Sequence, residues 1–384
     1  MRFEFATSQR IVFGPGTVAQ AGDIVASFGT HVLVVMGSRV ERAQPLIDQL
    51  TARRLTITRF QVTGEPTIAL AQRGRALAHE ARCDVVVSLG GGSVIDTGKA
   101  VAALATNTGD VLDYLEIIGK ARPLKQAPLP FVAIPTTSGS GAEATRNAVL
   151  ASPEHKVKVS LRSPLMLPTI ALVDPELTHD LPPGVTAATG MDALAQVLEP
   201  FVSTKASPLT DALCREGMAR AAQALRRAFE HGDDAAARAD MSLASLLGGM
   251  ALANAGLGAV HGFAAPIGGM FPAPHGAVCA RLLPIVFETN VRALRERAGD
   301  NPVLARFDEV ARILTLDTRA QAEAGAAWLR ELCGALGIAP LGSYGVAQAD
   351  VPGLVEKAAL ASSMQANPIK LTRDELSAIL SAAI

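Results

Sequence analysis

The stretch CDVVVSLGGGSVIDTGKA, residues 83–100, decides the fold class. Its first half is a continuous apolar, β-branched run, which is typical of a strand buried on both faces of a parallel sheet. Three glycines follow, and after them comes a pattern suited to a helix. A strand that passes through a glycine turn into a helix is the repeating unit of α/β folds. The N–H groups at the start of such a helix favour an anion.

The same alternation of strand and helix patterns extends over the first half of the chain. Apolar runs at 31–37, 130–137 and 169–174 predict further strands, and 39–53 and 67–82 predict helices between them. After LPPG (181–184) the strand patterns disappear and alanine-rich helical patterns follow to the end, where TRDE (372–375) has the form of a capping box. We therefore predict an α/β domain over 1–183 and an all-helical domain over 184–384.

Composition excludes several classes of protein. Lys plus Arg is 35 and Asp plus Glu is 36, so no basic excess points to nucleic acid. The four cysteines form no C-x-x-C pair, and the N-terminus lacks an apolar signal segment, which predicts a cytoplasmic protein. The uncharged run 241–260 is long enough to span a bilayer, but its glycines, serines and lack of flanking anchors favour a buried helix. We expect neither a membrane nor a nucleic-acid partner.

The glycine turn itself fits neither of two well-known nucleotide motifs. The Rossmann fingerprint requires glycine where this chain has Ile95, and a Walker A loop requires Ser or Thr where Ala100 follows Lys99. The turn is therefore either an ordinary strand-to-helix connection or a phosphate loop of another kind.

A second loop favours the phosphate alternative. IPTTSGSGAEAT (134–145) also follows a predicted strand and offers several hydroxyls beside two glycines. Two such loops at the carboxyl ends of strands mark the place where open α/β sheets bind a dinucleotide. The strand at 31–37 ends in Gly37, Ser38 and Arg39, without an acid for a ribose hydroxyl and with an Arg near, which leans toward NADPH.

Two further motifs suggest a metal. HGFAAPIGGMFPAPHG (261–276) begins at His261 and contains His275, and its prolines predict a bend across which the two imidazoles converge. In TAATGMDALAQVLEP (186–200), Asp192 and Gln196 share one helix face. A carboxylate with two imidazoles suits Zn, Fe or Mn. The alternative is that Thr189 and Asp192 merely cap the start of a helix.

Taken together, these motifs resemble the iron-containing (group III) alcohol dehydrogenases, which are allied in fold to glycerol dehydrogenase and dehydroquinate synthase. The resemblance runs from RIVFGPG (10–16) through the two glycine loops and 190–200 to 258–276. It implies a dehydroquinate synthase-like fold in which the α/β domain (1–183) binds the dinucleotide and the all-helical domain (184–384) binds metal and substrate, with the metal between the domains. It also implies hydride transfer between NAD or NADP and a small alcohol or aldehyde, a Lewis-acid metal, and a homodimer or higher homo-oligomer.

The resemblance also implies roles for individual residues. Asp192, His261 and His275 match catalytic metal ligands, and the matches to cofactor-contacting positions are Gly91, Gly92, Ser93, Asp96, Thr136, Thr137, Thr145 and Lys158. Gln196 stands where the family usually has a fourth, histidine ligand. An amide at this position is either a weak fourth ligand or a neighbour of the ligands, and it favours Zn or Mn over Fe(II). Ala265 replaces a histidine that in many members helps to move the alcohol proton.

Three rival functions share parts of this pattern. Maleylacetate reductases are metal-independent relatives that often lack the aspartate, so Asp192 argues against them. A lyase of the dehydroquinate synthase type needs a basic cluster for its substrate, and none lies near the ligand motifs. A nucleotide-binding protein that has lost its metal through the changes at Gln196 and Ala265 would bind cofactor without turnover.

Overall fold

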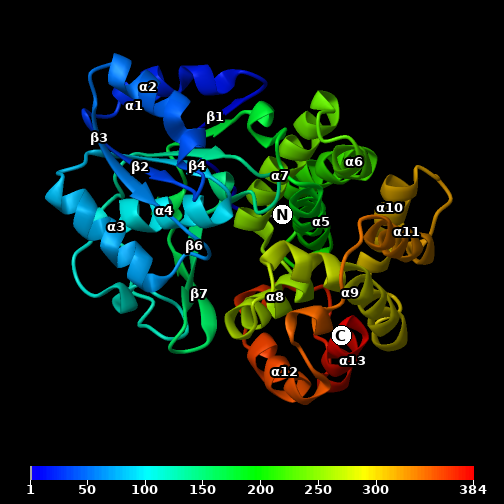
Figure 1. Ribbon diagram of the computed structural model, residues 1–384. Coiled ribbons are helices and arrows are strands. Elements are labelled where there is room, and N and C mark those ends of the chain that lie inside the picture. The colour runs from blue at the N-terminus through cyan, green and yellow to red at the C-terminus, as the bar shows by residue number, and fades with distance from the viewer. Residues whose placement is uncertain (1) are drawn as a thin grey trace. The chain divides into compact units, whose positions relative to one another are not determined.

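The computed structural model describes residues 2–384, which separate into an α/β unit and a helical unit (Figure 1). The α/β unit comprises Ala6–Thr137 and Gly141–Thr178. The helical unit comprises His179–Ile384 together with residues 2–5 and Ser138–Ser140. The predicted fold class is confirmed, whereas the boundary at 183 stays a prediction.

The α/β unit is built on a six-stranded sheet in the order β1-β8-β5-β4-β2-β3, with every neighbouring pair parallel. The four predicted strands correspond to β2, β4, β5 and β8. The sequence patterns missed β1 and β3, which lie at the two edges and are only partly buried, so they lack continuous apolar runs. The strands of the sheet are β1 (Arg10–Phe13), β2 (His31–Met36), β3 (Thr56–Gln61), β4 (Val85–Gly90), β5 (Phe131–Pro135) and β8 (Ile170–Val173).

Helices cover both faces of this sheet, which explains the uninterrupted apolar runs. Val32 and Val34 of β2 pack in one core with α1 (Ala21–Ala26) and α2 (Gln44–Ala52). Leu33 and Val35 point to the opposite core, with α3 (Ile68–Glu80) and α4 (Gly92–Thr106). The predicted helices 39–53 and 67–82 correspond to α2, with its preceding turn, and to α3.

An antiparallel pair, β6 (Asn147–Ser152) and β7 (Val157–Arg162), was also missed. Its buried side chains pack against α4 rather than joining the main sheet.

The helical unit contains one large core around α5, which is buried along most of its length. Glycines let its neighbours approach closely: a Cβ on Gly217 would lie 2.6 Å from Cγ1 of Val197 on α5. The helices are α5 (Pro183–Val202), α6 (Pro208–Glu230), α7 (Ala235–Ala255), α8 (Ala259–Met270), α9 (His275–Arg297), α10 (Val303–Thr315), α11 (Ala322–Ala335), α12 (Val351–Ala359) and α13 (Arg373–Ala383).

The apolar run 241–260 forms two helices and not the single helix predicted. α7 ends at Ala255 because Gly256 adopts a φ of 69°, and α8 begins at Ala259 after a bend of 99°. Within residues 2–384, no single helix has the length and apolarity to cross a membrane; only the bent pair of α7 and α8 meets both limits together.

Candidate active site

Asp192 lies in the middle of α5, three per cent exposed. The alternative interpretation of this aspartate as a helix cap is wrong, because α5 begins at Pro183 with its proline in the first turn. The hydroxyl of Thr189 donates back to the Val185 carbonyl within the helix (2.8 Å). The buried carboxylate therefore needs another explanation.

Two histidines meet this carboxylate from different helices. His261 lies in the first turn of α8, and His275 is the first residue of α9. The Nε2 atoms of His261 and His275 lie 3.2 and 3.7 Å from Oδ1 of Asp192. The two ring centroids are 5.4 Å apart. The predicted bend is present, since the chain between the helices passes through Pro272 and Pro274.

Sequence reasoning missed a fourth donor, Cys279. Its Sγ lies 3.7 Å from Nε2 of His261 and 3.6 Å from Nε2 of His275. The donor atoms of these three residues and Asp192 all lie within 4.8 Å of one another. The signal in the sequence is the spacing from His275, because residues four apart share a helix face.

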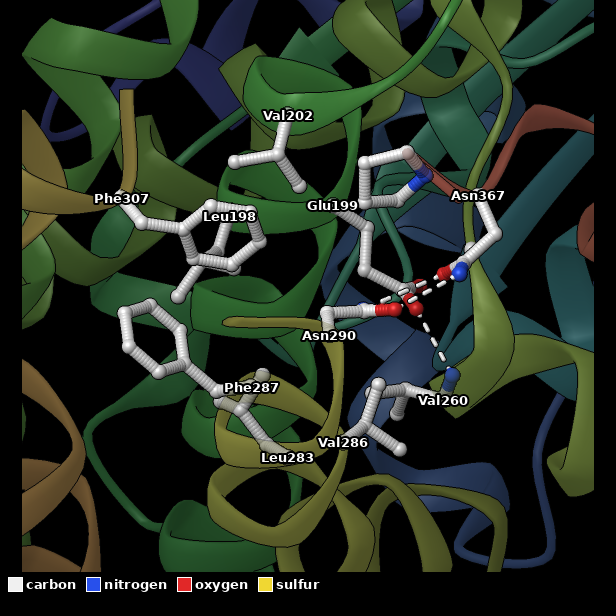
Figure 2. A pocket seen from close by; sticks show the side chains of 12 residues that line it. Leu198, Glu199, Val202, Val260, Leu283, Val286, Phe287, Asn290, Phe307 and Asn367 are labelled. Carbon is white, nitrogen blue, oxygen red and sulfur yellow. Dashed lines mark hydrogen bonds between the residues drawn. The ribbon is translucent and has the colours of Figure 1, made fainter. Parts of the chain in front are cut away.

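Glu199 is the second missed residue, and it orients His261. Figure 2 shows its side chain beside a small cavity, with a dashed line from the carboxylate to the backbone of Val260. Oε1 accepts from the Val260 N–H and Oε2 from Nδ1–H of His261, each at 2.7 Å. A carboxylate that holds Nδ1–H leaves Nε2 as the metal-binding nitrogen. The sequence signal is again spacing, since Glu199 lies seven positions, about two turns, beyond Asp192 on α5.

A second side chain, that of Asn367, caps the start of α8. Oδ1 of Asn367 accepts from the Ala259 N–H at 3.1 Å, and Asn290 pairs with Asn367 through two hydrogen bonds, both drawn in Figure 2. Because Asn367 and Glu199 satisfy two otherwise unpartnered N–H groups, the first turn of α8, and His261 within it, is held from two sides.

The carboxylate of Asp192 and the imidazole of His261 each favour the charged form of the other. Burial opposes the ionised form of Asp192, but His275 and His261 outweigh it and hold the pKa of this carboxyl below its ordinary value. Burial also opposes the charged form of His261, yet the acidic groups around the ring raise its pKa well above 6.5. Burial raises the pKa of the Cys279 thiol to about 12. The donor set of carboxylate, two imidazoles and thiol is one that binds Zn²⁺ or Fe²⁺, so the residues fit a divalent metal.

Gln196 lies one turn beyond Asp192 on α5 and is buried. Its Nε2 donates to the carbonyl of Gly139 at 3.0 Å, so the amide contacts the 138–140 loop. Its coordination of a metal stays a prediction.

Several predicted cofactor residues gather at one edge of the sheet. Gly37 and Ser38 follow β2, while Gly91, Gly92 and Ser93 follow β4, and the two strands are neighbours at the point where the strand order reverses. Thr136 and Thr137 follow β5; a Cβ on Gly91 would lie 3.4 Å from the Thr137 side chain. The start of α4 has no side-chain cap. In open α/β sheets this edge is where ligands bind.

The other predicted cofactor residues lie around a buried lysine. Nζ of Lys99 donates to Oγ1 of Thr145 at 2.8 Å, and Asp96 accepts from the Val149 N–H at 3.0 Å. Lys158 is seven per cent exposed and pairs with Glu65 at 3.0 Å. Burial raises the pKa of Asp96 to about 6. Their contact with a cofactor stays a prediction.

Comparison with known proteins shows the class to which this fold and metal cluster belong. The profile "Iron-containing alcohol dehydrogenase" matches residues 8–175, and "Fe-containing alcohol dehydrogenase family, C-terminal" matches residues 186–384. The chain belongs to the iron-containing alcohol dehydrogenase family. It is an oxidoreductase that acts on CH–OH groups, and a divalent metal site and the use of NAD(P) are typical of this family.

Individual relatives are similar over nearly the whole chain. Alcohol dehydrogenase 4 of Schizosaccharomyces pombe is 34% identical over 97% of this chain and 87% of its own. The 1,3-propanediol dehydrogenase of Klebsiella pneumoniae is 34% identical over 98% and 97%. A solved 1,3-propanediol oxidoreductase is 32% identical and covers both chains fully at a TM-score of 0.92. Sulfoacetaldehyde reductase from Bifidobacterium kashiwanohense, solved with NAD⁺, is 26% identical with a TM-score of 0.87 and covers 100% and 99%.

Proposed function

We propose that Asp192, His261 and His275 hold the catalytic metal of a reaction that moves a hydride between NAD(P) and a small alcohol or aldehyde. This proposal rests on the approach of two imidazole nitrogens, Nε2 of His261 on α8 and Nε2 of His275 on α9, to Oδ1 of Asp192 on α5, at 3.2 and 3.7 Å. A bound divalent metal supplies a Lewis acid for the substrate oxygen. The cofactor supplies the hydride chemistry.

The protein's own residues have separate tasks in this proposal. Asp192 provides the negative charge, and the Glu199 carboxylate fixes the ring orientation of His261. The side chain of His275 is 38% exposed, in contrast to the buried Asp192 and His261, so the open side of the site lies at His275. We expect the substrate to approach from that side.

Metal content tests this proposal. Protein purified without added metal and then loaded with Zn²⁺, Fe²⁺ or Mn²⁺ should bind one divalent ion per chain and oxidise short alcohols, including 1,3-propanediol, the substrate in the names of two similar proteins. Chelation should abolish turnover, and re-addition should restore it. Asp192→Ala should lose both metal and turnover, while Asp300→Ala, at an exposed site, should keep them. Full turnover in the metal-free protein would contradict the proposal.

We further propose that the residues at the carboxyl edge of the sheet bind the cofactor, with NADPH preferred over NADH. The support is the exposed Ser38 after β2, where a smaller, uncharged side chain leaves room for a 2′-phosphate. Ser38→Asp should raise the KM for NADPH and lower it for NADH, because an acid accepts from the ribose hydroxyl and repels a phosphate. Equal use of both cofactors by the parent and by Ser38→Asp would contradict this preference.

We also propose that the protein is a homodimer or larger homo-oligomer in the cytoplasm. The support for a reducing compartment is that Cys83, Cys214, Cys279 and Cys333 are all free and buried. Sedimentation velocity tests the assembly, since a single species at the mass of one chain would contradict it.

A further inference from the structure

The fourth donor, Cys279, has the position of a metal ligand. In a tetrahedral zinc site, bonds of about 2.0–2.3 Å place an imidazole nitrogen about 3.4 Å from a carboxylate oxygen and about 3.6 Å from a sulfur. The two nitrogen–oxygen distances here are 3.2 and 3.7 Å. The two nitrogen–sulfur distances are 3.7 and 3.6 Å. Four of the six donor–donor distances thus match those of a tetrahedral zinc site with one sulfur ligand, and the other two are at most 4.8 Å.

The local structure gives this thiol a fixed direction. Cys279 and His275 lie one turn apart on α9, so their side chains project from the same face. Cys279 is fully buried, and its Sγ lies within 3.7 Å of the Nε2 atoms of His261 and His275. The other cysteine of comparable burial in the helical unit, Cys214 on α6, belongs to no group of three or more potential metal ligands among the described residues. Burial alone therefore does not explain the surroundings of Cys279.

The competing fourth ligand is Gln196. Its amide already contacts the carbonyl of Gly139 through Nε2. A neutral amide oxygen is also a weaker ligand for a borderline-soft ion than a thiolate is.

We propose that the Cys279 thiolate is the fourth protein ligand of the metal, which deepens and rests on the function proposed above. On metal binding, the thiol proton passes to solvent and the sulfur lone pair forms the bond to the metal, with no change of oxidation state. A thiolate in the donor set selects Zn²⁺, Co²⁺ or Fe²⁺ over Mn²⁺ and Mg²⁺, which prefer oxygen ligands. With four protein ligands, a bound Zn²⁺ would accept a substrate oxygen only by expanding its coordination, as catalytic zinc sites can.

X-ray absorption of the zinc-loaded protein tests the ligand directly. The parent protein should show a sulfur shell at about 2.3 Å. Cobalt substitution should give a thiolate-to-cobalt charge-transfer band in the near ultraviolet. Both signals should persist in Cys214→Ala and in Gln196→Leu, and both should disappear in Cys279→Ala and Cys279→Ser. Zinc affinity should fall at least about tenfold in the two Cys279 variants, because even outer partners of ligands have effects of that size.

The outcomes separate the two proposals. Zinc bound to the parent protein without a sulfur shell overturns the role of Cys279 and leaves the three-residue metal site intact. Failure of the parent protein to bind any divalent metal overturns the proposed function itself. If neither Cys279 variant folds, the sulfur shell and the cobalt band of the parent protein decide the question alone.

Discussion

Glu199 controls which nitrogen of His261 is available to a metal. In Glu199→Gln, the amide oxygen can accept from the Val260 N–H, so the amide NH₂ then faces Nδ1 and favours the tautomer protonated at Nε2. We expect zinc affinity to fall about 10- to 100-fold with the fold retained. Competition with a chelating dye measures it. Glu331→Gln, at an exposed ion pair, is the matched control, and an unchanged affinity in Glu199→Gln would show that the carboxylate does not act on the metal.

Gly276 sets the distance between the ligands of α9 and the ligand of α5. A Cβ at this position would lie 2.5 Å from the carbonyl oxygen of Ala188, which is backbone and has little freedom to move. We expect Gly276→Ala to lower the free energy of unfolding by about 1–3 kcal/mol. It should also weaken metal binding, because His275 shifts away from Asp192.

Gly334→Ala is the control for that substitution. Gly334 lies within α11 and has no atom within 4 Å of the added Cβ, so the change should stabilise the protein by about 0.5–1 kcal/mol. Urea unfolding and zinc titration of both variants measure the two effects. Normal zinc affinity in Gly276→Ala would contradict the proposed link between this contact and the site.

At the scale of elements, Lys99 joins α4 to the segment 142–147. Its Nζ lies 2.7–2.9 Å from four acceptor oxygens, which its three N–H groups share: the carbonyls of Ala142, Thr145 and Asn147, and the hydroxyl of Thr145. Lys99→Met removes the donor and leaves buried acceptors without partners, so we expect a loss of about 3 kcal/mol or more in unfolding free energy. Urea unfolding measures this loss. Lys357→Met, at an exposed position on α12, should change stability by less than about 0.5 kcal/mol.

The elements also show what the sequence alone can predict. Strands buried on both faces were found because burial demands an unbroken apolar run, whereas β1, β3, β6 and β7 carry mixed patterns. The break between α7 and α8 was missed because a glycine in an apolar run does not reveal its φ. The ligand roles of Asp192, His261 and His275 rested on resemblance and spacing. Glu199 and Cys279 share helix faces with Asp192 and His275, but their contacts with His261 span 62 and 18 residues, and spacing within one helix does not predict those contacts.

At the scale of the whole molecule, a buried acid makes stability depend on pH. Burial raises the pKa of Glu143 from 4.5 to about 7, so between these values the folded state binds more protons than the unfolded state. Stability contributed by this group therefore falls as pH rises from 4.5 to 7. Glu143→Gln removes that dependence, so its unfolding free energy should rise relative to the parent across this range. Guanidinium unfolding at pH 5 and pH 7.5 measures the difference, and a constant difference would contradict the shift.

A metal should stabilise one unit of the molecule selectively, because all its donors lie in the helical unit. At 100 times its dissociation constant, a ligand adds about 2.7 kcal/mol to the state that binds it. We expect zinc to slow hydrogen exchange at the amides of α5, α8 and α9 and to leave α3 of the α/β unit unchanged. Mass spectrometry of exchanged peptides, with and without chelator, measures this, and uniform protection over both units would contradict it.

The spread of the ligands along the chain has a consequence for how each molecule is made. Asp192 precedes His261 by 69 residues. At a synthesis rate of about 5–20 residues per second, roughly 3 to 14 seconds pass between the synthesis of Asp192 and that of His261. Every copy therefore passes through a metal-free stage on the ribosome, during which the nascent helices have no partner for the buried carboxylate. In the proposed site, a metal can contact all three residues only after His275 has also been synthesised.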